Sequence, residues 1–218
     1  VAEALARDGL SLQLVREHIL FDGDEVLTQA GRPYTVFTPY KNAWLRRLHE
    51  VGLPLHASSE GALAKPPVAC GVPALAAIGF DAVDLAALGI RPGMSGAAER
   101  LSDFRARRPR YREQRDFPAV EGVSYLSPHL RFGTVSIRQL VREALQVGGE
   151  GGMTWLSELA WRDFYFMILD RFPHVVASSF RPEYDAIVWD DWPQGLAAWQ
   201  AGQTGFPLVD AAMRQLAT

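Results

Sequence analysis

Apolar residues recur at helical spacing through the second half of the chain. No segment there alternates clearly between apolar and polar residues, as a half-buried strand would. The glycine-rich stretch "QVGGEGGM", 146–153, is expected to be a flexible break between two helices. The pattern therefore predicts a mainly α-helical region. Its helices are expected at approximately 96–107, 108–115, 134–146, 152–170 and 193–201, with one more beginning near 206.

The first 50 residues have a different pattern. Residues 2–14 predict an amphipathic helix, and the apolar run "HILF", 18–21, predicts a buried strand followed by a turn. The chain is then expected to turn at Pro39 and to enter a helix from about Lys41. Helix, strand and helix in this order suggest the end of an α/β unit. So short a piece cannot bury a doubly wound sheet, so we expect the chain to be a fragment.

Residues 51–95 are rich in Pro, Ala and Gly and carry few charges, which predicts a long linker. A linker of this length is unusual inside a compact domain, so it is expected to join two domains. Ser95 is expected to cap the helix that follows.

Composition narrows the class of protein. The 218 residues are 48% hydrophobic and 11% aromatic, with a net charge of −3, so a nucleic-acid surface must be a local patch. The single cysteine, Cys70, excludes an internal disulfide framework and favours a reducing, cytoplasmic location. No apolar run reaches the roughly 18 residues of a membrane span, and no signal peptide is visible. The five histidines lack metal-ligand spacing, and no Gly-rich nucleotide motif or nucleophile elbow is present.

The stretch "WLSELAWRDFYF", 155–166, combines aromatic and charged residues on one predicted helix. About a third of its circumference carries Trp155, Glu158, Trp161, Arg162 and Tyr165. One interpretation is a core helix with a local Glu–Arg pair worth only a few tenths of a kcal/mol. The other is the wall of a pocket that offers flat stacking surfaces, a carboxylate and a guanidinium.

Three further segments carry candidate chemistry. The stretch 99–118 has seven arginines with Tyr111 and Phe117 between them, which suits either phosphate and base contacts or a solvated helical face. A hydroxyl-rich loop precedes Pro128, where Ser127 is expected to cap the helix that follows. This loop suits either the binding of an anion or an ordinary helix start. The "TGFP" turn at 204–207 is expected to be a structural helix start.

Taken together and in this order, these segments resemble the DNA photolyase/cryptochrome family, and within it the class I cyclobutane pyrimidine dimer photolyases. Five blocks keep their order and spacing over nearly the whole chain. They are "VFTPYKNAW" (36–44), "YREQRDFP" (111–118), "SYLSPHLRFGTVSIRQL" (124–140), "WLSELAWRDFY" (155–165) and "WQAGQTGFPLVDAAMRQL" (199–216).

The resemblance implies a fold and its cofactors. Residues 1–50 would be the end of an α/β, Rossmann-like antenna domain, 51–95 the interdomain linker, and 96–218 the first part of an all-helical FAD-binding domain. FAD is the implied cofactor. A second antenna chromophore, methenyltetrahydrofolate or a deazaflavin, is implied for the parent protein, and its identity stays open.

The resemblance also implies roles for single residues. Flavin contacts fall on Tyr111, Trp155 and Arg162, and on the phosphate loop Val123, Ser124, Tyr125, Leu126 and Ser127. Val123 stands where the family often has Thr, so one hydroxyl contact is lost. Glu158 and Trp161 match the pair that meets the extruded dimer. DNA contacts fall on Arg115, Glu158, Trp161 and Arg162, and Trp189 matches a surface electron-transfer tryptophan.

The implied activity is a light-driven carbon–carbon lyase reaction. Excited reduced FAD passes an electron to a cyclobutane pyrimidine dimer in DNA, the ring splits and the electron returns. The expected partner is dimer-containing DNA, with no membrane and a monomeric protein. Two alternatives stay open: a cryptochrome-type blue-light receptor without repair activity, and an inactive DNA-binding fragment. We expect the isolated chain to bind FAD poorly.

Overall fold

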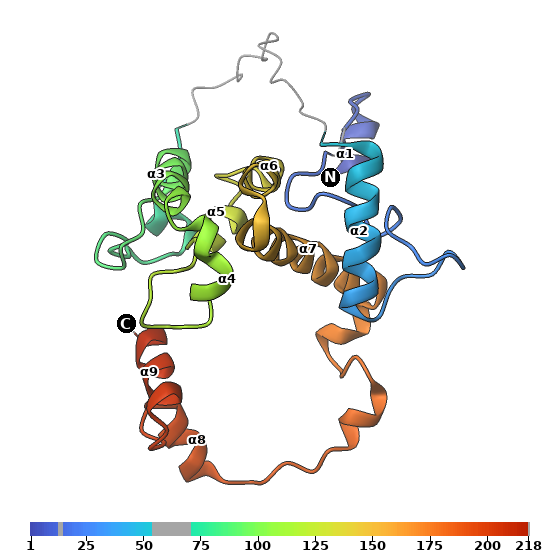
Figure 1. The fold of residues 1–218 in the computed structure, drawn as a ribbon. Coiled ribbons are helices and arrows are strands. Elements are labelled where there is room, and N and C mark those ends of the chain that lie inside the picture. Colours follow the sequence, from blue (N-terminus) through green and yellow to red (C-terminus); the bar gives the residue numbers. More distant parts are fainter. Residues whose placement is uncertain (13–14, 54–70, 218) are drawn as a thin grey trace. The chain divides into compact units, whose positions relative to one another are not determined.

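The computed structural model describes residues 1–12, 15–53 and 71–217, and within them the chain forms helices and loops without a β-strand (Figure 1). The mainly helical fold is confirmed. The α-helices are α1 (Ala2–Arg7), α2 (Phe37–Val51), α3 (Gly93–Arg105), α4 (Tyr111–Gln114), α5 (Ser127–Arg131), α6 (Ile137–Val147), α7 (Gly149–Arg171), α8 (Pro193–Gln200) and α9 (Pro207–Leu216). Short 3₁₀ turns are Leu75–Ile78, Arg108–Arg110, Pro173–Val176 and Pro182–Ala186.

Two compact units make up the chain. The first comprises residues 1–83 and 90–173, and the second comprises residues 84–89 and 174–218. The first unit therefore combines the predicted end of the antenna domain with most of the predicted helical domain. The boundaries 1–50, 51–95 and 96–218 stay a prediction.

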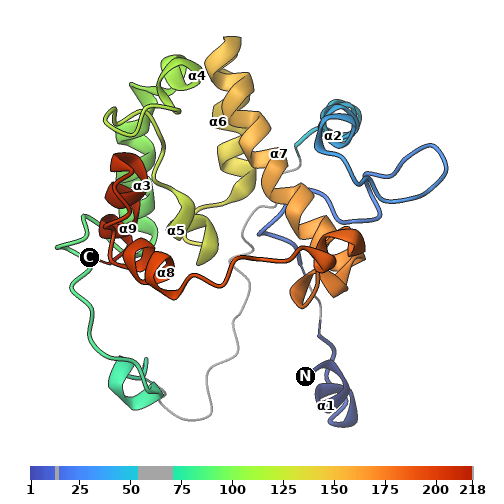
Figure 2. The same cartoon turned by 90° about the horizontal axis from the view of Figure 1, so that it is seen from below.

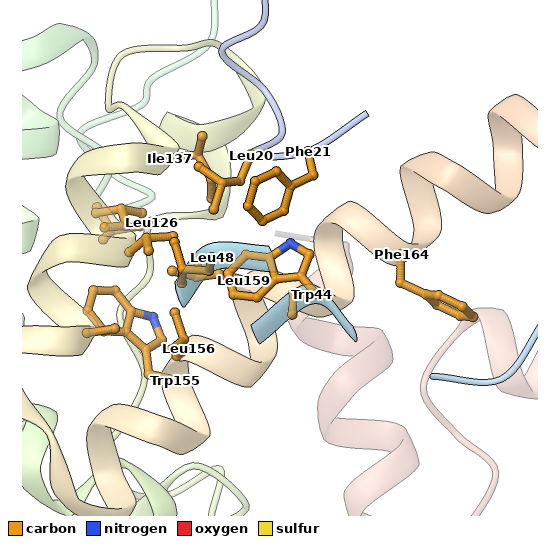
Figure 3. Close-up of a cluster of buried hydrophobic side chains, with 14 of the residues drawn as sticks. Leu20, Phe21, Trp44, Leu48, Leu126, Ile137, Trp155, Leu156, Leu159 and Phe164 are labelled. Atoms are coloured by element: carbon orange, nitrogen blue, oxygen red, sulfur yellow. The ribbon is translucent and has the colours of Figure 1, made fainter. Parts of the chain in front are cut away.

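The long helix α7 is the centre of the first unit. It packs against α6, α4 and α2, and both views place it between α6 and α2 (Figures 1 and 2). Its buried residues join those of the neighbouring helices in one core (Figure 3). The largest fully buried side chains of this core are Trp44, Tyr40, Phe104, Leu101 and Leu126.

The predicted break between two helices at 146–153 is present, but it is shorter than expected. Helix α6 ends at Val147 and α7 begins at Gly149, so Gly148 alone separates them. A methyl group on Gly151 would overlap the carbonyl oxygens of Arg108 and Pro109, and one on Gly152 would lie 2.6 Å from the carbonyl oxygen of Ala144. These glycines belong to the helix because neighbouring backbone passes too close for any side chain.

The predicted strand at 18–21 is also wrong. Leu20 and Phe21 are buried, but both backbone N–H groups donate to the carboxylate of Asp163. A buried amide needs a partner, and here a side chain replaces the neighbouring strand. Because Pro39 fits the first turn of a helix, α2 begins at Phe37, before the predicted Lys41.

Other boundaries move by a few residues. The first helix ends at Arg7, short of the predicted 2–14, of which residues 13–14 lie outside the described part. Pro92 rather than Ser95 precedes α3, and Ser127 is the first residue of α5 rather than its cap. The described part of the predicted linker, 71–92, is almost wholly exposed, and residues 54–70 with Cys70 lie outside the described residues.

In the second unit, the "TGFP" turn is held by the helix that follows it. The carboxylate of Asp210 accepts hydrogen bonds from the backbone N–H of Thr204 (2.7 Å) and of Gly205 (3.0 Å). The hydroxyl of Thr204 also donates to Asp210, and this bond holds the pKa of the carboxyl below its usual value. The expected structural role of this turn is confirmed.

Candidate functional site

The centre of the candidate site is an ion pair between α4 and α7. Arg115, directly after α4, donates to the carboxylate of Glu158 on α7 and lies over the ring of Tyr111, 5.6 Å from its centroid. The hydrogen bond to Glu158 raises the pKa of Arg115. The Glu158 side chain is still 33% exposed, so it can accept a further hydrogen bond from a ligand.

Tyr111 and Trp155 form the buried floor behind this pair. The ring of Phe104 lies between them, 5.8 Å from Tyr111 and 4.9 Å from Trp155, edge to face in both cases. Burial raises the pKa of the Tyr111 hydroxyl. Trp155 is only 3% exposed, so it packs in the core rather than standing on an open surface.

Trp161 belongs to an aromatic stack. Its ring lies 3.4 Å from that of Phe37 on α2, with 9° between their planes, and 5.3 Å from that of Tyr165, one turn further along α7. Tyr165 is 62% exposed and ends the stack on the solvent side. Stacking platforms of this kind suit nucleobases.

Arg162 points to a different neighbourhood. It donates to the backbone carbonyls of His18 (2.9 Å) and Leu130 (3.4 Å) and lies over the ring of Phe166. Burial lowers the pKa of its guanidinium. Glu158 and Arg162 therefore bind different partners, although they are only one turn apart on α7.

The loop before α5 has an unusual backbone. Tyr125 has φ of 53°, a left-handed conformation that non-glycine residues seldom adopt and that often marks a functional turn. The Ser124 hydroxyl accepts from the N–H of Leu126, which is buried. Ser127 is exposed, Val123 is partly buried, and the guanidinium of Arg100 lies over the Tyr125 ring.

Several of the arginines between 99 and 118 stabilise the fold. Arg105 and Arg108 both donate to the buried carboxylate of Glu143 on α6, and Arg107 pairs with Asp103. Arg112 pairs with Glu150 at the start of α7, about two turns of α7 before Glu158. A groove of about 520 Å³ lies beside this second pair, with Lys41 on its opposite wall.

Trp189 lies in the second unit, in the segment between the turn at 182–186 and α8, and is 79% exposed. The other predicted site residues, 111–162, all lie in the first unit.

Sequence reasoning missed Phe37 and Asp163. Phe37 lies inside the "VFTPYKNAW" block, but a contact across more than a hundred residues leaves no local signal. Asp163 stands next to Arg162 in the same helix, and nothing in the local sequence marks it as buried. It is 1% exposed and accepts hydrogen bonds from Leu20, Phe21 and Trp44.

The described residues contain no group of three or more His, Cys, Asp and Glu side chains that could hold a metal ion. None of the described helices is long and apolar enough to cross a membrane.

Two family models match this chain. The model described as "DNA photolyase" matches residues 1–60, and the model described as "FAD binding domain of DNA photolyase" matches residues 155–218. The second match begins at Trp155, inside α7, and includes the part of this helix that carries Glu158 and Trp161.

Curated relatives match along nearly the whole chain. The deoxyribodipyrimidine photo-lyase of Synechococcus sp. is 35% identical, over 99% of this chain and 47% of that protein. The deoxyribodipyrimidine photo-lyase of Escherichia coli is 36% identical, over 92% of this chain and 43% of that protein. The chain spans about half the length of the curated relatives it matches.

Solved structures share the fold. A class III photolyase from Agrobacterium tumefaciens aligns with a TM-score of 0.82 and 30% identity, over 98% of this chain and 46% of that chain. A cryptochrome from Synechocystis aligns with a TM-score of 0.75 over 99% of this chain and 47% of that chain. Its 21% identity shows a shared fold alone.

Proposed function

The chain belongs to the DNA photolyase/cryptochrome family, and from this premise we propose that the protein repairs cyclobutane pyrimidine dimers in DNA by light-driven electron transfer from reduced FAD. The observation that carries the proposal is the partly exposed carboxylate of Glu158 beside the stack of Trp161 and Tyr165 on one helix. A carboxyl group and an aromatic platform are the two features that a splayed pair of bases requires.

Glu158 is proposed to contact the dimer. Within the protein, Arg115 holds the carboxyl group of Glu158 in place. The exposed part of this carboxyl group can accept a hydrogen bond from a base edge. Trp161 and Tyr165 offer apolar surface to the extruded bases, which offsets part of the few kcal/mol lost on unstacking. Arg115 is also proposed to contact the phosphate backbone near the dimer, as is Arg162 from its separate position.

The described residues fit part of an FAD molecule. The left-handed turn at Tyr125, the exposed hydroxyl of Ser127 and the guanidinium beside Tyr125 provide donors suited to phosphate groups. We propose that Ser124, Leu126 and Val123 shape this loop, with Val123 contributing only backbone groups. Tyr111, Trp155 and Arg162 are proposed as the neighbouring flavin-pocket residues, and Trp189 as a surface electron-transfer residue.

When bound, reduced FAD supplies an electron to the dimer on excitation and takes it back after the ring has split. The residues of this chain do the remaining work. They bind the damaged strand, orient the dimer at Glu158, and exclude water around the aromatic stack.

The test is an absorption spectrum of the purified protein, followed by illumination with an oligonucleotide that contains one thymine dimer. Because this chain alone is expected to bind FAD poorly or not at all, FAD is added in excess, and we then expect light-dependent loss of the dimer. Glu158→Gln should lower the repair yield per absorbed photon by roughly tenfold at unchanged flavin content, the scale of one lost charge-assisted contact. Glu150→Gln is the matched control, because Glu150 also pairs with an arginine from α4 but lies at the start of α7.

Two results would argue against repair. Flavin without loss of dimers in the unsubstituted protein would favour a cryptochrome-type light receptor. Equal repair by the Glu158 and Glu150 variants would remove Glu158 from the reaction.

A further inference from the structure

The carboxylate of Asp163 joins three segments that are far apart in the sequence. It accepts hydrogen bonds from the backbone N–H of Leu20 (3.0 Å) and Phe21 (3.1 Å) and from the indole N–H of Trp44 (2.8 Å). Figure 3 shows Leu20, Phe21 and Trp44 gathered in one part of the core. Asp163 is 1% exposed and Trp44 is fully buried, so these bonds are closed to water.

Among the described residues, no helix or strand supplies another hydrogen-bond acceptor for these three N–H groups. Residues 20 and 21 lie outside any helix, so their amides depend on a side chain. A buried N–H group left without an acceptor costs about 1–3 kcal/mol. Asp163 therefore fixes α2 and the segment before it against α7.

The bond to Trp44 also fixes the rotation of α2. The residues of α2 that face α7 are Phe37, Tyr40, Trp44 and Leu48, spaced three and four apart, so they form one line along the helix. Phe37 lies two turns before Trp44 on this line, and its ring stacks on Trp161. Helix α7 thus contacts α2 through one hydrogen bond, from Trp44 to Asp163, and through one aromatic stack, between Phe37 and Trp161.

We propose that Asp163 is a positioning residue for Trp161: by holding Trp44 and α2, it keeps Phe37 stacked on Trp161 and fixes the ring that the extruded dimer meets. This proposal rests on the proposed function. Asp163 does not itself touch the dimer. Its effect reaches the site through α2.

The experiment compares Asp163→Asn with Glu143→Gln in the purified protein. Asparagine keeps the shape of the side chain but presents amide hydrogens toward a cluster of N–H donors. Glu143 on α6 is also a buried carboxylate, 8% exposed against 1% for Asp163, and it accepts hydrogen bonds from Arg105 and Arg108 rather than from α2. Both variants should lower the melting temperature. A difference in DNA selectivity between them therefore cannot arise from lost stability alone.

The decisive readout is selectivity, the ratio of dissociation constants for undamaged and dimer-containing oligonucleotides. Asp163→Asn should lower this ratio by roughly tenfold, the factor given by about one misplaced contact, while binding of undamaged DNA stays unchanged. Glu143→Gln should keep the ratio. A ratio in Asp163→Asn equal to that of Glu143→Gln would overturn the proposal.

A second readout needs no DNA. The near-ultraviolet circular dichroism of Trp161 is obtained as the difference between the protein and Trp161→Phe. This band should weaken in Asp163→Asn and in Trp44→Phe, which removes only one of the three donors, and should persist in Glu143→Gln. An unchanged band in both α2-linked variants would overturn the proposal even if Asp163→Asn folded poorly.

The two readouts separate this inference from the proposed function. If the unsubstituted protein does not distinguish dimer-containing DNA, the proposed function fails. The circular dichroism of Trp161 then still decides whether Asp163 positions that ring.

Discussion

The first half of α7, from Gly149 to Glu158, lies against α4, α6 and the turn at 108–110, whereas the second half lies against α2 and residues 20–21. In the first half, Gly151 and Gly152 let neighbouring backbone approach, and the ring of Trp155 packs against Phe104. The second half packs large aromatic rings and one buried carboxylate against its neighbours. Glu158 and Trp161 lie where the two halves meet, so the site depends on both modes of packing.

The largest effect is expected from breaking the first half. A methyl group in Gly151→Ala would overlap two backbone carbonyl oxygens, which cannot move without displacing the 108–110 turn. We expect a loss of about 3 kcal/mol in the free energy of unfolding, measured by urea denaturation. Met153→Ala, in the same helix and 45% exposed, should change it by less than about 0.5 kcal/mol. Equal stability of the two variants would contradict the close packing.

A smaller effect is expected from the arginine cluster beside the first half. Glu143→Gln removes the charge that Arg105 and Arg108 share and should cost about 1–2 kcal/mol, because charge-assisted hydrogen bonds become neutral ones. The cost should shrink in high salt, since Arg105 is half exposed. A salt-independent loss would show that packing, rather than charge, accounts for it.

The smallest effect is a difference in pH dependence between the halves. Hydrogen bonding from Arg105 holds the pKa of Glu143 below its usual value, so its stabilisation is lost as pH falls. Burial raises the pKa of Asp163 to about 6, despite its three hydrogen bonds and the nearby Arg162. Arg16 and Tyr40 also face this carboxylate.

The stability that Asp163 contributes therefore changes with pH in the opposite direction to that of Glu143. The folded state favours its protonated form, so its contribution to stability is largest at low pH and falls as pH rises toward about 6. The difference in unfolding free energy between the protein and Asp163→Asn, measured from pH 4 to pH 7, should follow this curve. The same difference for Glu143→Gln should have the reverse slope in its acidic part. Parallel curves would refute the assignment.

The sequence predicted the helices of the second half to within a few residues, and the apolar periodicity is clearest in α6 and α9. At 146–153 it found the break between α6 and α7 but made it too long, because Gly151 and Gly152, which normally disfavour a helix, lie inside α7 where neighbouring backbone comes close. It failed at 18–21, where the burial was correct but the partner was a distant carboxylate instead of a strand. At the site, periodicity placed Glu158 and Trp161 on one face, but their separate partners Arg115 and Phe37 arise from tertiary packing.

The bond between Leu20 and Asp163 spans 143 residues, and this span has a consequence for synthesis on the ribosome. At about 5–20 residues per second, translation from one partner to the other takes on the order of 10–30 seconds. During that time Leu20, Phe21 and Trp44 have been made, but the helix that buries them has not. The emerging chain therefore exposes these apolar side chains until α7 leaves the exit tunnel, and we expect chaperones that bind nascent proteins to bind this segment.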